Sequence, residues 1–247
     1  MEGRGGERAP GGAKEKRANE LLSLAALLGL ASLGCGVLYG LRVLVSGRIY
    51  YLYLILNLVL AAVPFCIAAA AALLLDRLGP GRRQALAALP AALLWLLFYP
   101  NAPYIFTDFI HLVNKIYLRS PPADWLGLNA LVWYDILMNA AFAFMGHFIG
   151  LVSMWLMERL MRRAWGRVPS RAFLLLAILL SGFGIYLGRF SRLNSWDALL
   201  SPLRVAGETL EALKDPKALL FSLVFALFIA LSYGALAAFK RLPEPLG

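Results

Sequence analysis

The chain has 247 residues, of which 61% are hydrophobic and only 15% are charged, and its mean hydropathy is +0.71. Soluble domains are about half apolar and about a quarter charged, so this composition excludes a soluble Rossmann or barrel enzyme, a secreted disulfide scaffold and a DNA-binding domain. The net charge of +10 is typical of basic residues that flank membrane spans, so we expect the lipid bilayer and anionic lipids as partners, and no nucleic acid.

Apolar runs of membrane-spanning length recur along the chain and predict an all-α integral membrane protein, a bundle of about six transmembrane helices. The first 20 residues are glycine-rich and charged, which is typical of a disordered tail. The predicted spans cover residues 21–45, 51–75, 84–99, 126–157, 171–188 and 218–239. We therefore expect a single transmembrane domain over residues 21–240, between a tail of residues 1–20 and a short tail of residues 241–247.

Basic residues are distributed unevenly between the two sides of this arrangement. If the N-terminus is cytoplasmic, 15 of the 24 lysines and arginines lie on cytoplasmic segments. Cytoplasmic loops of membrane proteins carry the excess of basic residues. We therefore expect both termini to be cytoplasmic, in a multi-pass protein of the cell (inner or plasma) membrane.

Asp135 lies about ten residues into the fourth predicted span, roughly 15 Å along the helix. A carboxylate at such a depth costs roughly 2.5–3.5 kcal/mol, so it should face protein or a wet cavity and have a partner. Arg189 and Arg192, at the outer end of the fifth span, are the partners that we expect for it.

The fourth and fifth predicted spans each carry small residues at helical spacing, which let two helices approach closely in lipid. They are Gly146 and Gly150 in the fourth span, and Ser181, Gly184 and Gly188 in the fifth. We expect these two stripes to pack against each other near the membrane centre.

Polar residues of residues 101–125 and of the segment after the fifth span should meet Asp135 around one outward-facing mouth. Two or more carboxylates in a half-dry mouth are what general acid–base catalysis requires. The candidate catalytic residues are Asp108, His111, Asp135 and Asp197. The candidate substrate-binding residues are Asn101, Tyr104, Asn139, Arg189, Arg192, Asn194 and Trp196.

Each of these groups has a structural alternative. Asp108 and His111 could bind a divalent metal with another carboxylate, but a helix cap and an interfacial histidine are favoured, so we assign no metal ligands and leave the cofactor open. The two arginines could bind a phosphate or carboxylate, or only pair with acidic residues. Asn194 and Asp197 could cap the helix that follows them.

Three strings, PNAPYIFTDFIHL, WYDILMNAAFAFMGHFIGLVSMWLMERL and GFGIYLGRFSRLNSWD, resemble the hallmark blocks of a family of bacterial multi-pass membrane proteins. In the family these blocks read NAPYxxTD, WYD and GRxxRxNSWD, and the resemblance covers about residues 25–240. The family is known only as a domain of unknown function. The resemblance therefore implies a bacterial integral membrane protein and no particular activity.

Three classes of function stay open. The polar cluster favours an enzyme that handles a lipid or a phosphate at the outer leaflet, with a lipid-linked or anionic substrate. A structural or assembly subunit of a membrane complex is the main alternative. A small-solute transporter is a further one, although polar groups become sparse below Asn139. The sequence gives no oligomeric state.

Overall fold

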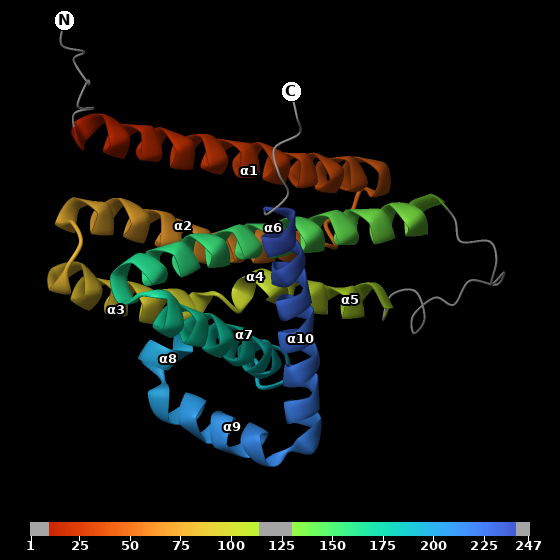
Figure 1. The fold of residues 1–247 in the computed structure, drawn as a ribbon. Coiled ribbons are helices and arrows are strands. Elements are labelled where there is room, and N and C mark those ends of the chain that lie inside the picture. The colour runs from red at the N-terminus through yellow and green to blue at the C-terminus, as the bar shows by residue number, and fades with distance from the viewer. Residues whose placement is uncertain (1–9, 114–129, 241–247) are drawn as a thin grey trace, which may run out of the picture.

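The computed structural model describes residues 10–113 and 130–240, and within them every regular element is a helix (Figure 1). The long helices are α1 (Pro10–Ser46), α2 (Leu52–Leu78), α3 (Arg82–Phe98), α6 (Ala130–Trp165), α7 (Arg167–Phe190) and α10 (Pro216–Phe239). The shorter ones are α4 (Asn101–Tyr104), the 3-10 helix η1 (Ile105–Asp108), α5 (Phe109–Val113), α8 (Asp197–Leu200) and α9 (Pro202–Lys214).

In the described part of the chain, six helical segments are long and apolar enough to cross a membrane. This confirms the prediction of an all-α membrane protein with about six spans. Helix α1 begins at Pro10, well before the apolar stretch that starts at Leu21, because charged residues continue the helix beyond its apolar part. Residues 1–9 and 241–247 of the two predicted tails lie outside the described residues.

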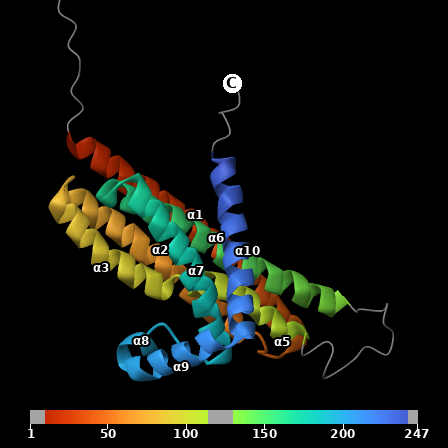
Figure 2. The same cartoon turned by 60° about the horizontal axis from the view of Figure 1, so that its bottom comes forward.

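Six successive crossings return the chain to the side on which it started. Figure 2 shows the N-terminal end of α1 and the C-terminal end of α10 at one end of the bundle, and α8 and α9 at the other. We call the first end the terminal face; it also holds the α2–α3 and α6–α7 connections. The other end, the opposite face, holds the α1–α2 connection, α8 and α9.

The third span is longer than the sequence predicted. Residues 101–113 were expected outside the membrane, but α4, η1 and α5 follow α3 almost without a break, and the apolar helical segment runs from Arg82 to Val113. The third span was predicted to end at Tyr99, just before Pro100. The chain continues as helical turns, because the Ala102 N–H donates to the Tyr99 carbonyl and the Tyr104 N–H to the Pro100 carbonyl. Residues 114–125 of the predicted loop lie outside the described residues.

The two glycine stripes do not simply face each other. The α4–η1 segment lies between them, and the glycines of both stripes, Gly146, Gly150, Gly184 and Gly188, face its residues. A Cβ on Gly150 would lie 2.6 Å from the Ala102 Cβ, and a Cβ on Gly184 would lie 2.9 Å from Pro100 Cγ. The small residues therefore make room for a proline-rich segment inside the bundle, rather than for a direct contact between α6 and α7 at these positions.

Helix α6 is the central helix of the bundle and packs against α1, α2, α3 and α7. Between the α4–η1 segment and the terminal face, large side chains fill the core. Trp95 and Tyr99 are fully buried, and the Trp95 indole donates a hydrogen bond of 2.7 Å to Ser153 Oγ. The α4–η1 segment therefore packs against a layer of large, buried side chains.

Candidate functional site

A cavity of about 220 Å³ opens towards the opposite face, where α2, the start of α4, the end of α7 and the segment leading into α9 meet. Many of its lining residues are apolar, and two are glycines, where the backbone itself borders the cavity. Its polar lining consists of Asn57, Asn101, Tyr104, Asn194, Ser195 and the ring of Trp196. The cavity is therefore surrounded by amides and hydroxyls that can make hydrogen bonds.

The two polar blocks that line the cavity are joined directly. Asn101 Nδ2 donates a hydrogen bond of 3.1 Å to Ser195 Oγ, across a separation of 94 residues in the chain. A Cβ on Gly188 would lie 3.2 Å from the Tyr104 ring, so the glycine lets this ring lie against α7. The predicted convergence of the 101–125 segment with the segment after the fifth span is therefore present at Asn101 and Ser195, while residues 114–125 lie outside the described residues.

The turn after α7 holds the second block in place. The Ser191 and Leu193 N–H groups both donate to the Leu187 carbonyl, so the chain folds back over the last turn of α7. Arg192 occupies the left-handed position of this turn, with φ 53°. Glycine usually occupies this position, because a side chain there costs roughly 1–2 kcal/mol.

Replacement of Arg192 by glycine is therefore expected to raise the free energy of unfolding by about 1 kcal/mol. Chemical unfolding in detergent, followed by circular dichroism, measures this difference. Arg192→Lys keeps the strained backbone and the charge, so it should unfold like the wild type. A less stable Arg192→Gly protein would mean that the guanidinium contributes more to the fold than the backbone strain costs.

Asp108 lies directly behind the cavity wall. Its carboxylate is 2% exposed and accepts a hydrogen bond of 2.6 Å from the Asn57 amide, which itself lines the cavity. Within the described residues Asp108 forms no ion pair. Asn57 therefore connects a buried carboxylate to the space in which a ligand would bind.

Three further groups surround this carboxylate. The rings of Tyr53 and His111 are in contact, with centroids 4.7 Å apart. The guanidinium of Arg189 is close enough for its charge to act on Asp108, His111 and Tyr53. In the part of the chain that the structure describes, Arg189 has no ion pair of its own, and the Tyr53 hydroxyl has no hydrogen-bond partner.

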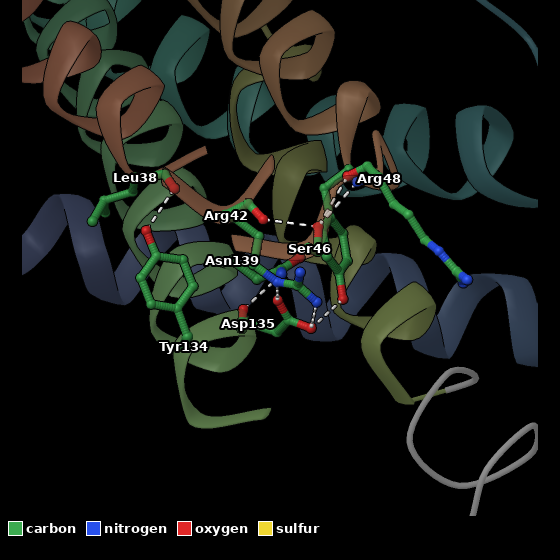
Figure 3. A network of polar contacts seen from close by, with 8 residues as sticks. Leu38, Arg42, Ser46, Arg48, Tyr134, Asp135 and Asn139 are labelled. Atoms are coloured by element: carbon green, nitrogen blue, oxygen red, sulfur yellow. Dashed lines mark hydrogen bonds and ion pairs between the residues drawn. The ribbon is translucent and has the colours of Figure 1, made fainter. Parts of the chain in front are cut away.

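Asp135 belongs to a second polar cluster, shown in Figure 3, between α1, α6 and the start of α2. The Arg42 guanidinium donates to both carboxylate oxygens, with a distance of 3.2 Å from Nη2 to Oδ2, and the Tyr51 hydroxyl donates at 2.7 Å. Asn139 donates to the Asp135 backbone carbonyl. Burial and the neighbouring carboxylate raise the pKa of the Tyr51 phenol, so it remains a proton donor to Asp135.

The prediction that Asp135 has a buried cationic partner is confirmed, but the predicted partner was wrong. Arg42 pairs with Asp135, and neither Arg189 nor Arg192 forms an ion pair with it. Arg42 lies on α1, whose C-terminal end approaches α6 at this point. The charge of Arg189 instead acts on the group around Asp108.

The remaining candidate residues lie apart from the group around Asp108. Asp197 accepts a hydrogen bond of 2.7 Å from the Asn194 N–H and so closes the turn before α8, but no side chain caps α8. Arg192 is exposed. Asn139 lies with Asp135 rather than at the cavity. Among the described residues, no three His, Cys, Asp or Glu side chains gather as a metal site would need.

The structure adds residues that the sequence analysis did not select. They are Tyr53, Asn57 and Ser195 near the cavity, and Arg42 and Tyr51 in the Asp135 cluster. Asn57 stood out as the single amide in a long apolar run, which was an available signal. Arg42 sat near the end of a span, where basic residues are common and carry little information.

Comparison with known proteins gives one match. The family model described as "Protein of unknown function (DUF1361)" matches residues 56–232, which include the cavity, Asp108 and Asp135 but not α1. No curated protein and no solved structure matches the chain.

Proposed function

The chain belongs to the DUF1361 family, and we propose that it is a cell-membrane enzyme that acts on the phosphate-bearing headgroup of a lipid at the outer leaflet. Both termini are then cytoplasmic, and the cavity opens on the extracytoplasmic side. The observation that carries this proposal is the cavity itself, which is lined by side-chain amides at one end of a membrane bundle. Behind it, the buried carboxylate of Asp108 is hydrogen-bonded to the lining residue Asn57, and the charge of Arg189 acts on that carboxylate.

The cavity lies beside a helix suited to the membrane surface. Helix α9 has one polar side and one side of exposed leucines, with Leu203 88% and Leu210 59% exposed. Such a helix lies along the interface, with its apolar face among the lipids. Val205 of α9 lines the cavity, together with Trp196 just before α8. The cavity is therefore at the depth of lipid headgroups, which a lipid could enter from the bilayer.

The side chains present have the chemistry for a phosphate ester. Arg189 forms no ion pair within the described residues. Such a guanidinium can bind phosphate oxygens through its paired N–H donors. Asn101 and Asn194 can hydrogen-bond the hydroxyl or ester oxygens of the headgroup. Asp108, with Asn57 between it and the cavity, is the group that would take or give a proton.

One specific observation favours the alternative of a structural or assembly subunit. Two of the three candidate catalytic carboxylates have structural contacts, because Asp135 pairs with Arg42 and Asp197 closes a turn. Asp108 lies beside the cavity and forms no ion pair within the described residues. The enzyme proposal therefore depends on Asp108, and the experiment separates the two functions there.

The test uses dioctanoyl phosphatidic acid, a soluble lipid with a phosphate headgroup, and the purified full chain in detergent. Calorimetry measures binding and phosphorus NMR measures conversion of the lipid. We expect Arg189→Gln to weaken binding at least about tenfold, because it removes the charged partner of the phosphate. We expect Asp108→Asn to retain binding but to slow conversion about 100-fold or more.

Arg48→Gln is the matched control, since Arg48 is an exposed arginine on the same face and lies away from the cavity. It should leave binding and conversion unchanged. Binding that is equally strong in the Arg189→Gln protein would contradict a phosphate site. Binding without any conversion by the wild type would contradict an enzyme of this class and leave the structural alternative.

A further inference from the structure

A second cavity, of about 170 Å³, lies at the terminal face between α1, α2 and α6. Its inner walls are apolar: Leu21, Leu24, Ala72, Leu156 and Leu160. Its rim is charged and includes Arg17, Asp76, Arg159 and Arg163, with Trp155 beside them. The cavity is thus amphipathic. Its polar end lies at the surface of the terminal face, and its apolar end lies towards the bilayer.

The acidic rim residue Asp76 is shared by two arginines. Its carboxylate lies 2.8 Å from Arg17 Nη1 and 3.2 Å from Arg163 Nη1. One negative charge therefore faces two positive charges on opposite walls of the cavity. Glu20 also lines the cavity, but it has no hydrogen bond or ion pair to these arginines among the described residues.

Two further cations lie on the indole ring of Trp155. The Arg159 guanidinium is 4.8 Å from the ring centroid, and Lys240 Nζ, just after α10, is 3.3 Å from it. Within the described residues neither cation forms an ion pair. The nearby carboxylate of Glu158 instead accepts a hydrogen bond from the Tyr233 hydroxyl. Burial, together with the positive charge of Arg159, lowers the pKa of the Lys240 amine to about 8.

We propose that this cavity binds the headgroup phosphate of an anionic phospholipid, with part of an acyl chain against its leucine wall. The rim carries more positive than negative charge, and a phosphate beside Arg159 and Arg163, with Lys240 on the adjacent Trp155 ring, would balance it. Basic pockets between transmembrane helices are where acidic lipid headgroups bind. The apolar wall favours a lipid over a free phosphate ion, because an ion would leave that wall without contacts.

This site is separate from the proposed headgroup cavity, since it lies at the other end of the bundle and shares no lining residue with it. It also contains α1, which lies outside the family match. A lipid between α1 and the rest of the bundle would attach this largely exposed helix by its inner end, as the Arg42–Asp135 pair does at its outer end.

The test measures lipid retention by native mass spectrometry of the full chain in detergent, titrated with dioleoyl phosphatidylglycerol or dioleoyl phosphatidylcholine. We expect the wild type to retain phosphatidylglycerol about tenfold more than phosphatidylcholine. The double variant Arg159→Gln/Lys240→Gln should lose this preference. Neither side chain forms a hydrogen bond or ion pair within the described residues, so the variant should still fold, and an unchanged melting temperature checks this.

The matched control is Arg82→Gln/Arg83→Gln, which removes two exposed charges from the same face at the start of α3. It should keep the preference, and so should Arg189→Gln at the other end of the bundle. The proposal is overturned if the control loses as much preference as the test variant, or if the wild type has none. Displacement of the lipid by millimolar inorganic phosphate would overturn a lipid site in favour of a free-anion site.

Discussion

Replacement of Asp135 by asparagine is expected to lower the free energy of unfolding by about 3–5 kcal/mol. Arg42 is 5% exposed and pairs with Asp135 through both of its carboxylate oxygens. Asparagine keeps the shape of the side chain but removes its charge. The arginine would then remain buried at membrane depth without a counter-charge, which is the costly outcome for an ionisable residue in a bilayer.

A double-mutant cycle separates the interaction energy of the Arg42–Asp135 pair from the effects of the two single substitutions. We expect Arg42→Gln/Asp135→Asn to recover a large part of the loss, because two neutral amides can hydrogen-bond where one unpaired cation cannot. Unfolding in detergent, followed by circular dichroism, gives the four free energies. Arg17→Gln, which removes the exposed pair with Asp76, is the control and should cost less than about 1 kcal/mol.

The result also bears on the function of Asp135. If Asp135→Asn kept the stability of the wild type and instead abolished conversion of a lipid substrate, Asp135 would be a catalytic residue, as the sequence allowed. The ion pair with Arg42 predicts the reverse, a less stable protein that still converts its substrate at the temperatures where it is folded.

The need of Asp135 for a partner could be predicted from the sequence, and the identity of that partner could not. Depth in the bilayer is a property of one span and follows from hydropathy. Which arginine reaches the carboxylate depends on how α1 lies against α6, and no pattern in α1 encodes this, since most of its surface is exposed. The sequence offered Arg189 and Arg192 because they shared the expected depth.

The cavity, too, could be predicted from the sequence only in part. Its two polar blocks were expected to meet because the number of spans places them on one side, and Asn101 and Ser195 do meet there. The helical continuation of the third span beyond Tyr99 was not predicted, because the stretch that follows mixes polar and apolar residues and does not stand out as an apolar run. Asp108 and His111 were therefore expected outside the membrane, with the conformation of their segment left open, whereas they lie on η1 and α5 within the third apolar helical segment.

Replacement of Gly182 by alanine is expected to cost about 1–3 kcal/mol or more, because α7 and α10 touch at this glycine. A Cβ there would lie 2.1 Å from the Ser222 carbonyl oxygen and 3.0 Å from the Ala226 amide nitrogen. Both are backbone atoms of α10, so no side-chain rotation relieves the overlap, and the two helices must separate.

The matched control is Gly234→Ala on α10, where a Cβ would meet nothing within 4 Å. This variant should be neutral or more stable by up to about 1 kcal/mol, since alanine is the better helix former. Unfolding in detergent compares the two variants. Gly184, two residues along α7, lines the headgroup cavity, so separation of α7 from α10 should also weaken lipid binding in Gly182→Ala but not in Gly234→Ala. A Gly182→Ala protein with wild-type stability and binding would show that α10 can move away at no cost, and that the cavity does not depend on the α7–α10 contact.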